Sequence, residues 1–164
     1  MAQFSAKNLA GNGQIWYADP DAAEQQRDIY TFERPNWHAA VGCEHCAARE
    51  AAVLFDQTYL GKFVLKGPDA EAVLNWIAAN DVSKPAGSLV YTQMLNDQGG
   101  IECDLTCVRM AENEYYIVTG TSFVTHDFDH ISKNIPAGMN AQFVDVTSAY
   151  AVLLLFGPHA RPIL

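Results

Sequence analysis

The stretch NDQGGIECDLTCVR, residues 96 to 109, places a carboxylate inside a run that otherwise reads as a β-strand. Its Gly-Gly pair supplies turn chemistry, and the residues that follow alternate, so they are expected to form the second arm of a hairpin. On such a strand Asp104 faces away from Cys103 and Leu105. A carboxylate fixed on a strand can accept a proton or stabilise a cationic nitrogen. The residues alone leave open whether Asp104 faces a cavity or solvent.

A second pattern is HDFDH, in which His126 and His130 lie one helical turn apart. This spacing can hold a metal ion on one face of a helix. The sequence offers no third ligand at a recognisable distance, so a solvated helix face is the preferred interpretation and no metal is assigned. The Gly-x-Gly in GNGQIW, residues 11 to 16, has no third glycine and no preceding strand, and it does not predict a dinucleotide fold.

Four cysteines allow a different kind of site. Cys43-x-x-Cys46 has a zinc-like spacing, but it lies in an alanine-rich stretch typical of a helix, without the tight turns of a zinc knuckle. Cys103 and Cys107 share the apolar face of their strand, as small buried hydrophobes do. We therefore expect reduced cysteines used for packing, with a zinc site or a redox pair as less favoured alternatives.

Composition limits the class of protein. The chain has 164 residues, 49% hydrophobic and 18% charged, which suits one globular domain with a core. Its net charge of −9 disfavours nucleic acid and anionic lipid as partners. No apolar run reaches the roughly 20 residues of a membrane-spanning helix, and the N-terminus lacks the features of a signal peptide. The sequence thus predicts a soluble, cytoplasmic protein with no nucleic acid or membrane partner.

The elements that position these residues follow from periodicity and turn signals. Residues 1–40 lack a sustained period and predict an extended lead, with a possible short helix over 20–28, that packs through its aromatic side chains. Residues 41–164 predict an α+β fold with an antiparallel sheet and packed helices. The expected helices cover residues 43–54, 68–79 and 121–134. The expected strands cover residues 59–67, 88–96, 101–109 and 115–120, with one or two more within 141–157.

An internal echo links two parts of the chain. VLKGPDAEAVL, residues 64–74, resembles LLFGPHARPIL, residues 154–164, so that a strand, Gly-Pro-x-Ala and an apolar pair recur 90 residues later. The first copy continues as a helix, whereas the second reaches the last residue of the sequence. We therefore expect a piece of a longer protein, truncated at its C-terminal end, and exposed apolar surface that favours self-association of the piece.

Three segments resemble the aminomethyltransferase (glycine cleavage T-protein) folate-binding family: AREAAVLFDQTYLGKFVLKGPDAEAVLNWI, YTQMLNDQGGIECDLT and YYIVTG. The lead motif ERPNW, residues 33–37, is similar to the branch fused behind a flavin domain, the dimethylglycine and sarcosine dehydrogenases. The resemblance covers most of residues 29–164, and its segments occur in family order. It implies a partial folate-binding aminomethyltransferase fold for residues 41–164.

The resemblance also assigns site residues. In this family tetrahydrofolate lies in a central cavity, and the carboxylate beside the reactive amines of its pterin matches Asp104. The usual enzyme has two acids in a row there, whereas Cys103 takes the first place here. Gly120 stands where the glycine-cleavage enzymes commonly have asparagine, which puts that polar contact in doubt and favours the flavin-linked branch. Positions that line the folate pocket match Leu60, Tyr91 and Val118.

The activity implied is capture of a one-carbon iminium, derived from a small N-methylated amine, as 5,10-methylenetetrahydrofolate. Any FAD would bind a part of the protein outside this chain. Two alternatives stay open: a stand-alone folate-dependent aminomethyltransferase or demethylase, and a folate-binding regulatory module without turnover. Scattered basic residues such as Arg34, Lys62 and Arg109 are interpreted as surface, although one could meet the anionic tail of folate.

Overall fold

The computed structural model describes residues 30–164. The short helix expected over 20–28, and most of the expected lead, lie outside the described residues. Tyr30 is 82% exposed and Phe32 is fully exposed, so the expected packing of the lead through its aromatics does not hold for these two side chains. The described residues divide into two compact units: Thr58–Val152 form the larger one, and the residues up to Gln57 together with Leu153–Leu164 form the smaller.

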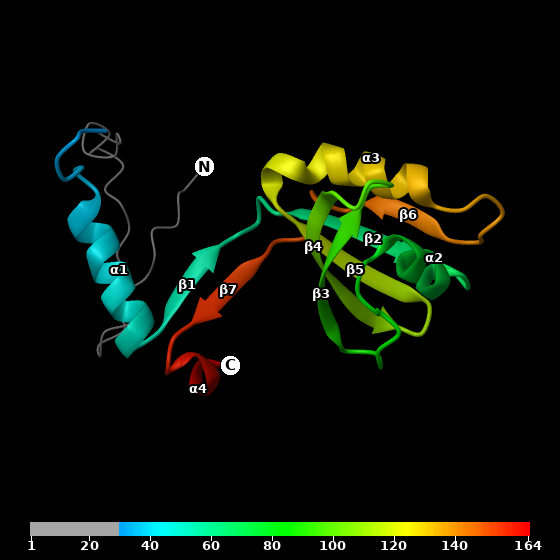
Figure 1. The fold of residues 1–164 in the computed structure, drawn as a ribbon. Coiled ribbons are helices and arrows are strands. Elements are labelled where there is room, and N and C mark those ends of the chain that lie inside the picture. The colour runs from blue at the N-terminus through cyan, green and yellow to red at the C-terminus, as the bar shows by residue number, and fades with distance from the viewer. Residues whose placement is uncertain (1–29) are drawn as a thin grey trace. The chain divides into compact units, whose positions relative to one another are not determined.

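The larger unit contains a five-stranded antiparallel sheet, and the order of its strands is β3-β4-β5-β2-β6 (Figure 1). The antiparallel order of β3, β4 and β5 is expected from the turn signals between them, and the structure confirms it. The α+β class with an antiparallel sheet is also confirmed. The strands are β2 (Gly61–Lys66), β3 (Leu89–Leu95), β4 (Ile101–Ala111), β5 (Glu114–Thr119) and β6 (Gln142–Asp145).

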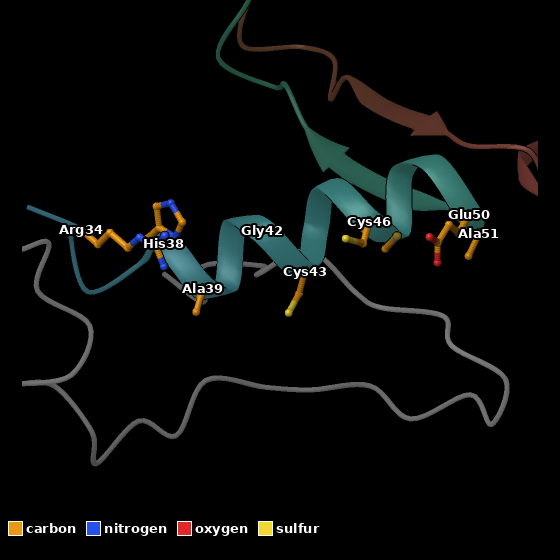
Figure 2. A pocket seen from close by; sticks show the side chains of 9 residues that line it. Arg34, His38, Ala39, Gly42, Cys43, Cys46, Glu50 and Ala51 are labelled. Carbon is orange, nitrogen blue, oxygen red and sulfur yellow. The ribbon is translucent and has the colours of Figure 1, made fainter.

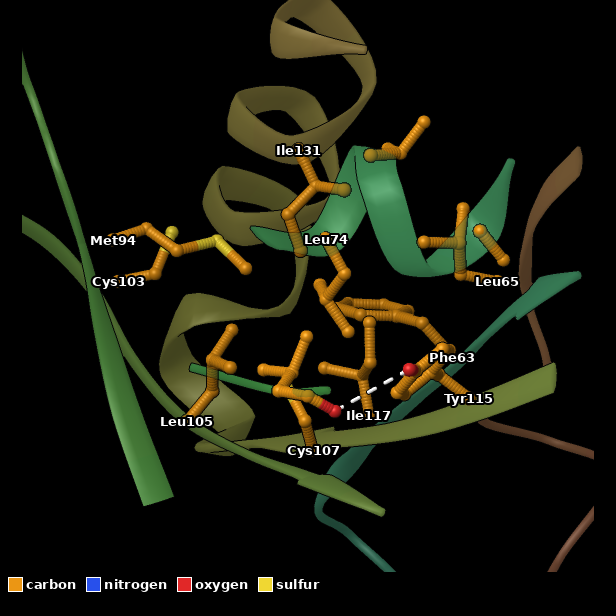
Figure 3. Close-up of a cluster of buried hydrophobic side chains, with 13 residues drawn as sticks. Phe63, Leu65, Leu74, Met94, Cys103, Leu105, Cys107, Tyr115, Ile117 and Ile131 are labelled. Carbon is orange, nitrogen blue, oxygen red and sulfur yellow. Dashed lines mark hydrogen bonds between the residues drawn. The ribbon is translucent and has the colours of Figure 1, made fainter. Parts of the chain in front are cut away.

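Two helices cover one face of this sheet: α2 (Ala70–Ile77) and α3 (Val124–Asn134), the second preceded by the 3₁₀ turn η1 (Thr121–Phe123). Figure 3 shows the apolar side chains that fill the space between helices and sheet. Burial of this cluster provides the main driving force for folding of the unit. Its members are Phe63, Leu65, Ala70, Val73, Leu74, Val82, Met94, Cys103, Leu105, Cys107, Tyr115, Ile117 and Ile131.

Helix α2 is shorter than the expected span of residues 68–79. Pro68 precedes the first turn rather than lying within it, because the backbone bends at Gly67 and turns before Ala70. At the other end Ala78 is extended, with ψ 142°, and forms a β-bridge to Met94. A contact with the sheet therefore ends the helix where its sequence would still permit another turn.

The smaller unit pairs β1 (Val53–Asp56) with β7 (Leu153–Phe156) in a two-stranded antiparallel sheet. It also contains α1 (His38–Glu50) and the short α4 (Ala160–Ile163). The expected helix over residues 43–54 is wrong at its C-terminal end, because the helix stops at Glu50 and β1 follows. The local sequence is helical in character, but pairing with a distant strand decides the conformation of Val53–Asp56.

The internal echo corresponds to a repeated structure. After β2 the chain bends at Gly67, with φ +146°, and after β7 it bends at Gly157, with φ +120°. In the first copy Asp69 N–H donates to the carbonyl of Asn140, and in the second His159 N–H donates to that of Ala51. The carbonyl of each glycine accepts from the N–H three residues later at 3.0 Å. Similar sequences have thus produced the same backbone turn at the two glycines.

The strands next to the repeat pair with each other and not with their neighbours in the chain. β1 leads into β2 and β6 leads into β7, yet β2 pairs with β6 and β7 pairs with β1. A threonine in each linking segment accepts a backbone hydrogen bond from the other part of the chain: Thr147 Oγ1 accepts from Lys62 N–H at 3.0 Å, and Thr58 Oγ1 accepts from Val152 N–H at 3.2 Å.

The close approach at Gly67 gives a stability prediction. A Cβ on Gly67 would collide with the backbone oxygen of Asn140 and lie 2.9 Å from Cα of Ala141, at a φ that L-residues rarely adopt. Gly67→Ala should lower the free energy of unfolding by about 3 kcal/mol, measured by urea denaturation. Gly87→Ala is the matched control, because Gly87 also has positive φ but no atom near its Cβ, and about 1 kcal/mol is expected there. Equal losses would show that the collision is unimportant.

Candidate functional site

The face of the sheet opposite the helices carries the candidate site. Along β4, Cys103, Leu105 and Cys107 are buried in the core, and the residues between them point to the other face. Asp104 is exposed on that other face. The interpretation of Asp104 as a residue that faces away from the core is therefore confirmed.

The register gathers the predicted residues on this face. Tyr91 of β3 lies opposite Thr106 of β4, which in turn lies opposite Val118 of β5. Gly61 pairs with Thr119, so Leu60 and Gly120, the next residues outward, lie together at the same end of the sheet as Asp104. Val118, Leu60 and Gly120 are partly buried. Tyr91, Asp104 and Val118 thus share one face of the sheet, and Leu60 and Gly120 adjoin its strands at the end nearest Asp104.

Asp104 is held by two neighbours on β3. Gln93 Nε2 donates a hydrogen bond of 2.9 Å to Asp104 Oδ1. Tyr91, whose side chain is 58% exposed, lies close enough that a hydrogen bond to the Asp104 carboxylate raises the pKa of the phenol. The raised pKa has a physical cause: the carboxylate accepts from the neutral phenol and repels the phenolate. The carboxylate is therefore oriented but open to a ligand.

Gln93 was missed by the sequence analysis. Its signal was present, because residues two apart on a strand share a face and Gln93 follows Tyr91 by two. The register that places it directly opposite Asp104 is set by the turn at residues 96–100, where Asn96 accepts from Gly100 N–H and from Gln98 N–H through its side chain.

Lys62 and Arg109 are not surface residues, which corrects the sequence-based interpretation. Lys62 has no exposed area, and its Nζ donates to the carbonyls of Thr58 at 2.7 Å and Tyr150 at 2.8 Å. The side chain of Arg109 is 15% exposed and pairs with Glu71. Lys62 therefore connects the segment between β1 and β2 to the segment between β6 and β7. Arg109 holds α2 against the sheet. Lys62 shares its cross-strand row with Val118.

The cysteines fall into two classes. Cys103 and Cys107 are buried packing residues, as expected, and burial raises the pKa of the Cys107 thiol to about 12. Cys43 and Cys46 are free but exposed on α1, so the packing interpretation is wrong for this pair. Figure 2 shows both on the helix, beside a shallow hollow that also involves His38, Ala39, Gly42 and Ala47. Cys43 and Cys46 thus lie about one helical turn apart on α1 and not in the tight turn of a zinc knuckle.

The HDFDH segment opens helix α3. Asp127 is 1% exposed and accepts a hydrogen bond from the Thr119 hydroxyl, so it is buried and is not part of a solvated face. His126 is half exposed, and its neighbour Asp127 raises the pKa of the imidazole through a hydrogen bond.

Within residues 30–164 no helix is long and apolar enough to cross a bilayer.

The fold agrees with what comparison with known proteins shows. Residues 15–164 match the model of the GCVT N-terminal domain. The chain belongs to that family. Human mitochondrial sarcosine dehydrogenase is 36% identical over 151 residues, and the 4-methylaminobutanoate oxidase (formaldehyde-forming) of Paenarthrobacter nicotinovorans is 38% identical over 149 residues. The alignments cover 84% and 91% of the chain.

A solved structure of a family member shows the same fold. The aminomethyltransferase T of the glycine cleavage system from Bartonella henselae superposes with a TM-score of 0.69 and 28% identity, over 74% of this chain. The chain spans 33% of that structure, 16% of the human dehydrogenase and 18% of the oxidase. The expected family and the partial aminomethyltransferase fold are thereby confirmed.

The contact between Tyr91 and Asp104 gives a prediction for pH titration. Asp104→Asn removes the negative charge that disfavours the phenolate, so the pKa of Tyr91 should fall towards its ordinary value. The titration is followed by the ultraviolet absorbance of phenolate, with a Tyr91→Phe protein subtracted to isolate the signal. Asp97→Asn, in the exposed turn of the same hairpin, should leave the titration unchanged. An unchanged Tyr91 pKa in Asp104→Asn would refute the contact.

Proposed function

We propose that this chain is the tetrahydrofolate-binding part of an enzyme of one-carbon transfer, of the flavin-linked dimethylglycine or sarcosine dehydrogenase type. Its reaction is capture of a one-carbon iminium, derived from an N-methylated amine, as 5,10-methylenetetrahydrofolate. Support comes from membership of the GCVT family and from relatives whose names are sarcosine dehydrogenase and 4-methylaminobutanoate oxidase. A flavin would bind a part of the protein outside this chain. A cytoplasmic location stays an expectation.

The observation that carries the proposal is the position of Asp104. It is the carboxylate that the family motif would place beside a pterin, and it lies on an open face instead of in the core. Reaction of an iminium with an amine concentrates positive charge on nitrogen and leaves a proton to remove. A fixed carboxylate suits both needs, because it stabilises the cationic charge and accepts the proton.

The surroundings of Asp104 fit a flat heteroaromatic ligand that bears amines. Tyr91 offers an exposed ring for stacking, and Leu60 and Val118 offer partly buried apolar surface. Among the described residues, a Cβ added at Gly120 would meet only the ring of Phe123, at 3.5 Å, so the backbone there leaves space for a ligand. When bound, tetrahydrofolate supplies the nitrogen atoms that take up the one-carbon unit. Asp104, oriented by Gln93, would receive the proton.

Asp104→Asn in the full-length protein tests the proposed chemistry. The variant should capture the one-carbon unit on tetrahydrofolate about 10² to 10³ times more slowly, because the side chain keeps its shape but loses its charge. The assay measures 5,10-methylenetetrahydrofolate formed from the N-methylated amine. Asp97→Asn, an exposed acid of the same hairpin, should behave as the parent. An unchanged rate in Asp104→Asn would remove this carboxylate from the mechanism.

A second candidate is a stand-alone folate-dependent aminomethyltransferase, favoured by the likeness to the Bartonella henselae structure. The two candidates differ in the origin of the one-carbon unit. The flavin-linked enzyme should bleach its flavin absorbance when a secondary or tertiary N-methylated amine is added without oxygen. The aminomethyltransferase should instead release ammonia from an aminomethyl donor and carry no flavin. A protein with neither activity that still binds tetrahydrofolate would be the regulatory module.

A further inference from the structure

A group of potential metal ligands lies on the other side of β4 from Asp104. Cys103 projects from β4 into the core, while His126 and Asp127 project from the first turn of α3. The Cys103 thiol, a ring nitrogen of His126 and a carboxylate oxygen of Asp127 all lie within 4.8 Å of one another. Sequence analysis found the histidines but not the cluster, because its third member comes from a strand more than 20 residues earlier in the chain.

Neighbouring groups orient the ring of His126. Its Nδ1 lies 3.0 Å from Asp127 Oδ1, on the side of the cluster, and its Nε2 lies 3.2 Å from Glu102 Oε2. Glu102 is itself held, since Asn96 Nδ2 donates to its Oε1 at 2.8 Å. Histidines that ligate metals commonly donate their outer N–H to a carboxylate in this way, which fixes the tautomer that leaves the inner nitrogen free to bind.

Among the described residues, Asp127 has no ion pair with a permanently charged side chain. Asp127 is 1% exposed, and among the described residues its ion pair is with His126, which is charged only when protonated. Its other oxygen accepts from the neutral hydroxyl of Thr119. A buried carboxylate is costly unless a cation compensates it. Nearby, Nε2 of His130 is buried without a hydrogen-bond partner in the described structure, and its ring stacks on that of His126.

We propose that Cys103, His126 and Asp127 bind one divalent ion of the zinc class, with Glu102 and Thr119 as the groups that orient two of these ligands. A thiolate, an imidazole and a carboxylate form a mixed set that suits zinc and cobalt and is too soft for magnesium or calcium. Binding displaces the thiol proton of Cys103, and the proton passes to solvent. A metal is thus placed where the sequence-based expectation assigned none.

The site would be structural and would not depend on the proposed function. Its ligands join the start of α3 to β4, and Cys103 is next to Asp104 in sequence but on the opposite face of the sheet. Bound metal would therefore fix the helix behind the strand that carries Asp104, without touching a ligand on the open face. Loss of metal and loss of the Asp104 chemistry are consequently separable results.

The test uses the full-length protein after treatment with a chelator. Zn²⁺ should bind with one equivalent in competition with a chromophoric chelator, and it should raise the melting temperature. Co²⁺ should give a thiolate-to-metal charge-transfer band together with the visible bands of a four-coordinate site, in which water is the fourth ligand beside Cys103, His126 and Asp127. Asp127→Asn and Cys103→Ala should abolish binding in the micromolar range, and Glu102→Gln should weaken it roughly 10- to 100-fold.

Matched variants separate this site from other thiols. Cys107→Ala removes a buried cysteine from the same face of the same strand and should leave binding unchanged. The double variant Cys43→Ser, Cys46→Ser should also retain one equivalent. Loss of the equivalent in that double variant, or no binding of Zn²⁺ to the parent in the micromolar range, would overturn the proposal. Cobalt bound without a charge-transfer band would do so even if Cys103→Ala does not fold.

Discussion

The two-residue period of strand β4 is the constraint on which the rest of the structure depends. One set of its side chains, Cys103, Leu105 and Cys107, completes the core beneath α2 and α3. The other set carries Asp104 onto the opposite face, where Gln93 meets it across the ladder. Because the period of a strand is fixed, a shift of one residue would bury the carboxylate and expose the core. The register that builds the core is thus the same register that exposes Asp104.

Much of the fold could be predicted from sequence because the signals were local. The hairpin β3-β4-β5 is marked by its turns, α2 by Gly-Pro and apolar spacing, and Asp104 by alternation along one strand. The remaining candidate residues, Leu60, Tyr91, Val118 and Gly120, came from the family resemblance. The strand register puts Tyr91 and Val118 on the face of Asp104, and Leu60 and Gly120 directly follow the paired residues at the end of the sheet nearest to it.

The features that sequence could not supply arise from contacts between distant segments. Val53 and Leu54 were predicted as the end of a helix, and pairing with β7 makes them the start of a strand. Lys62 lies in an alternating run that gives no sign of burial, yet its ammonium group donates to the carbonyls of Thr58 and Tyr150. The burial of Asp127 could not be seen in the helix sequence, because its partner Thr119 lies on a strand that the helix packs against. Pairing and burial of this kind are properties of the tertiary structure.

The pairing of β1 with β7 has a consequence for how the chain folds. During synthesis β1 emerges well before its partner β7, with the whole of the larger unit between them. The ribosome must therefore deliver the whole of the larger unit before the smaller sheet can close. Contacts so distant in sequence make assembly slow and leave an unpaired edge open to neighbouring chains in the meantime. The edge of β1 is therefore exposed to aggregation throughout synthesis of the larger unit, until β7 follows.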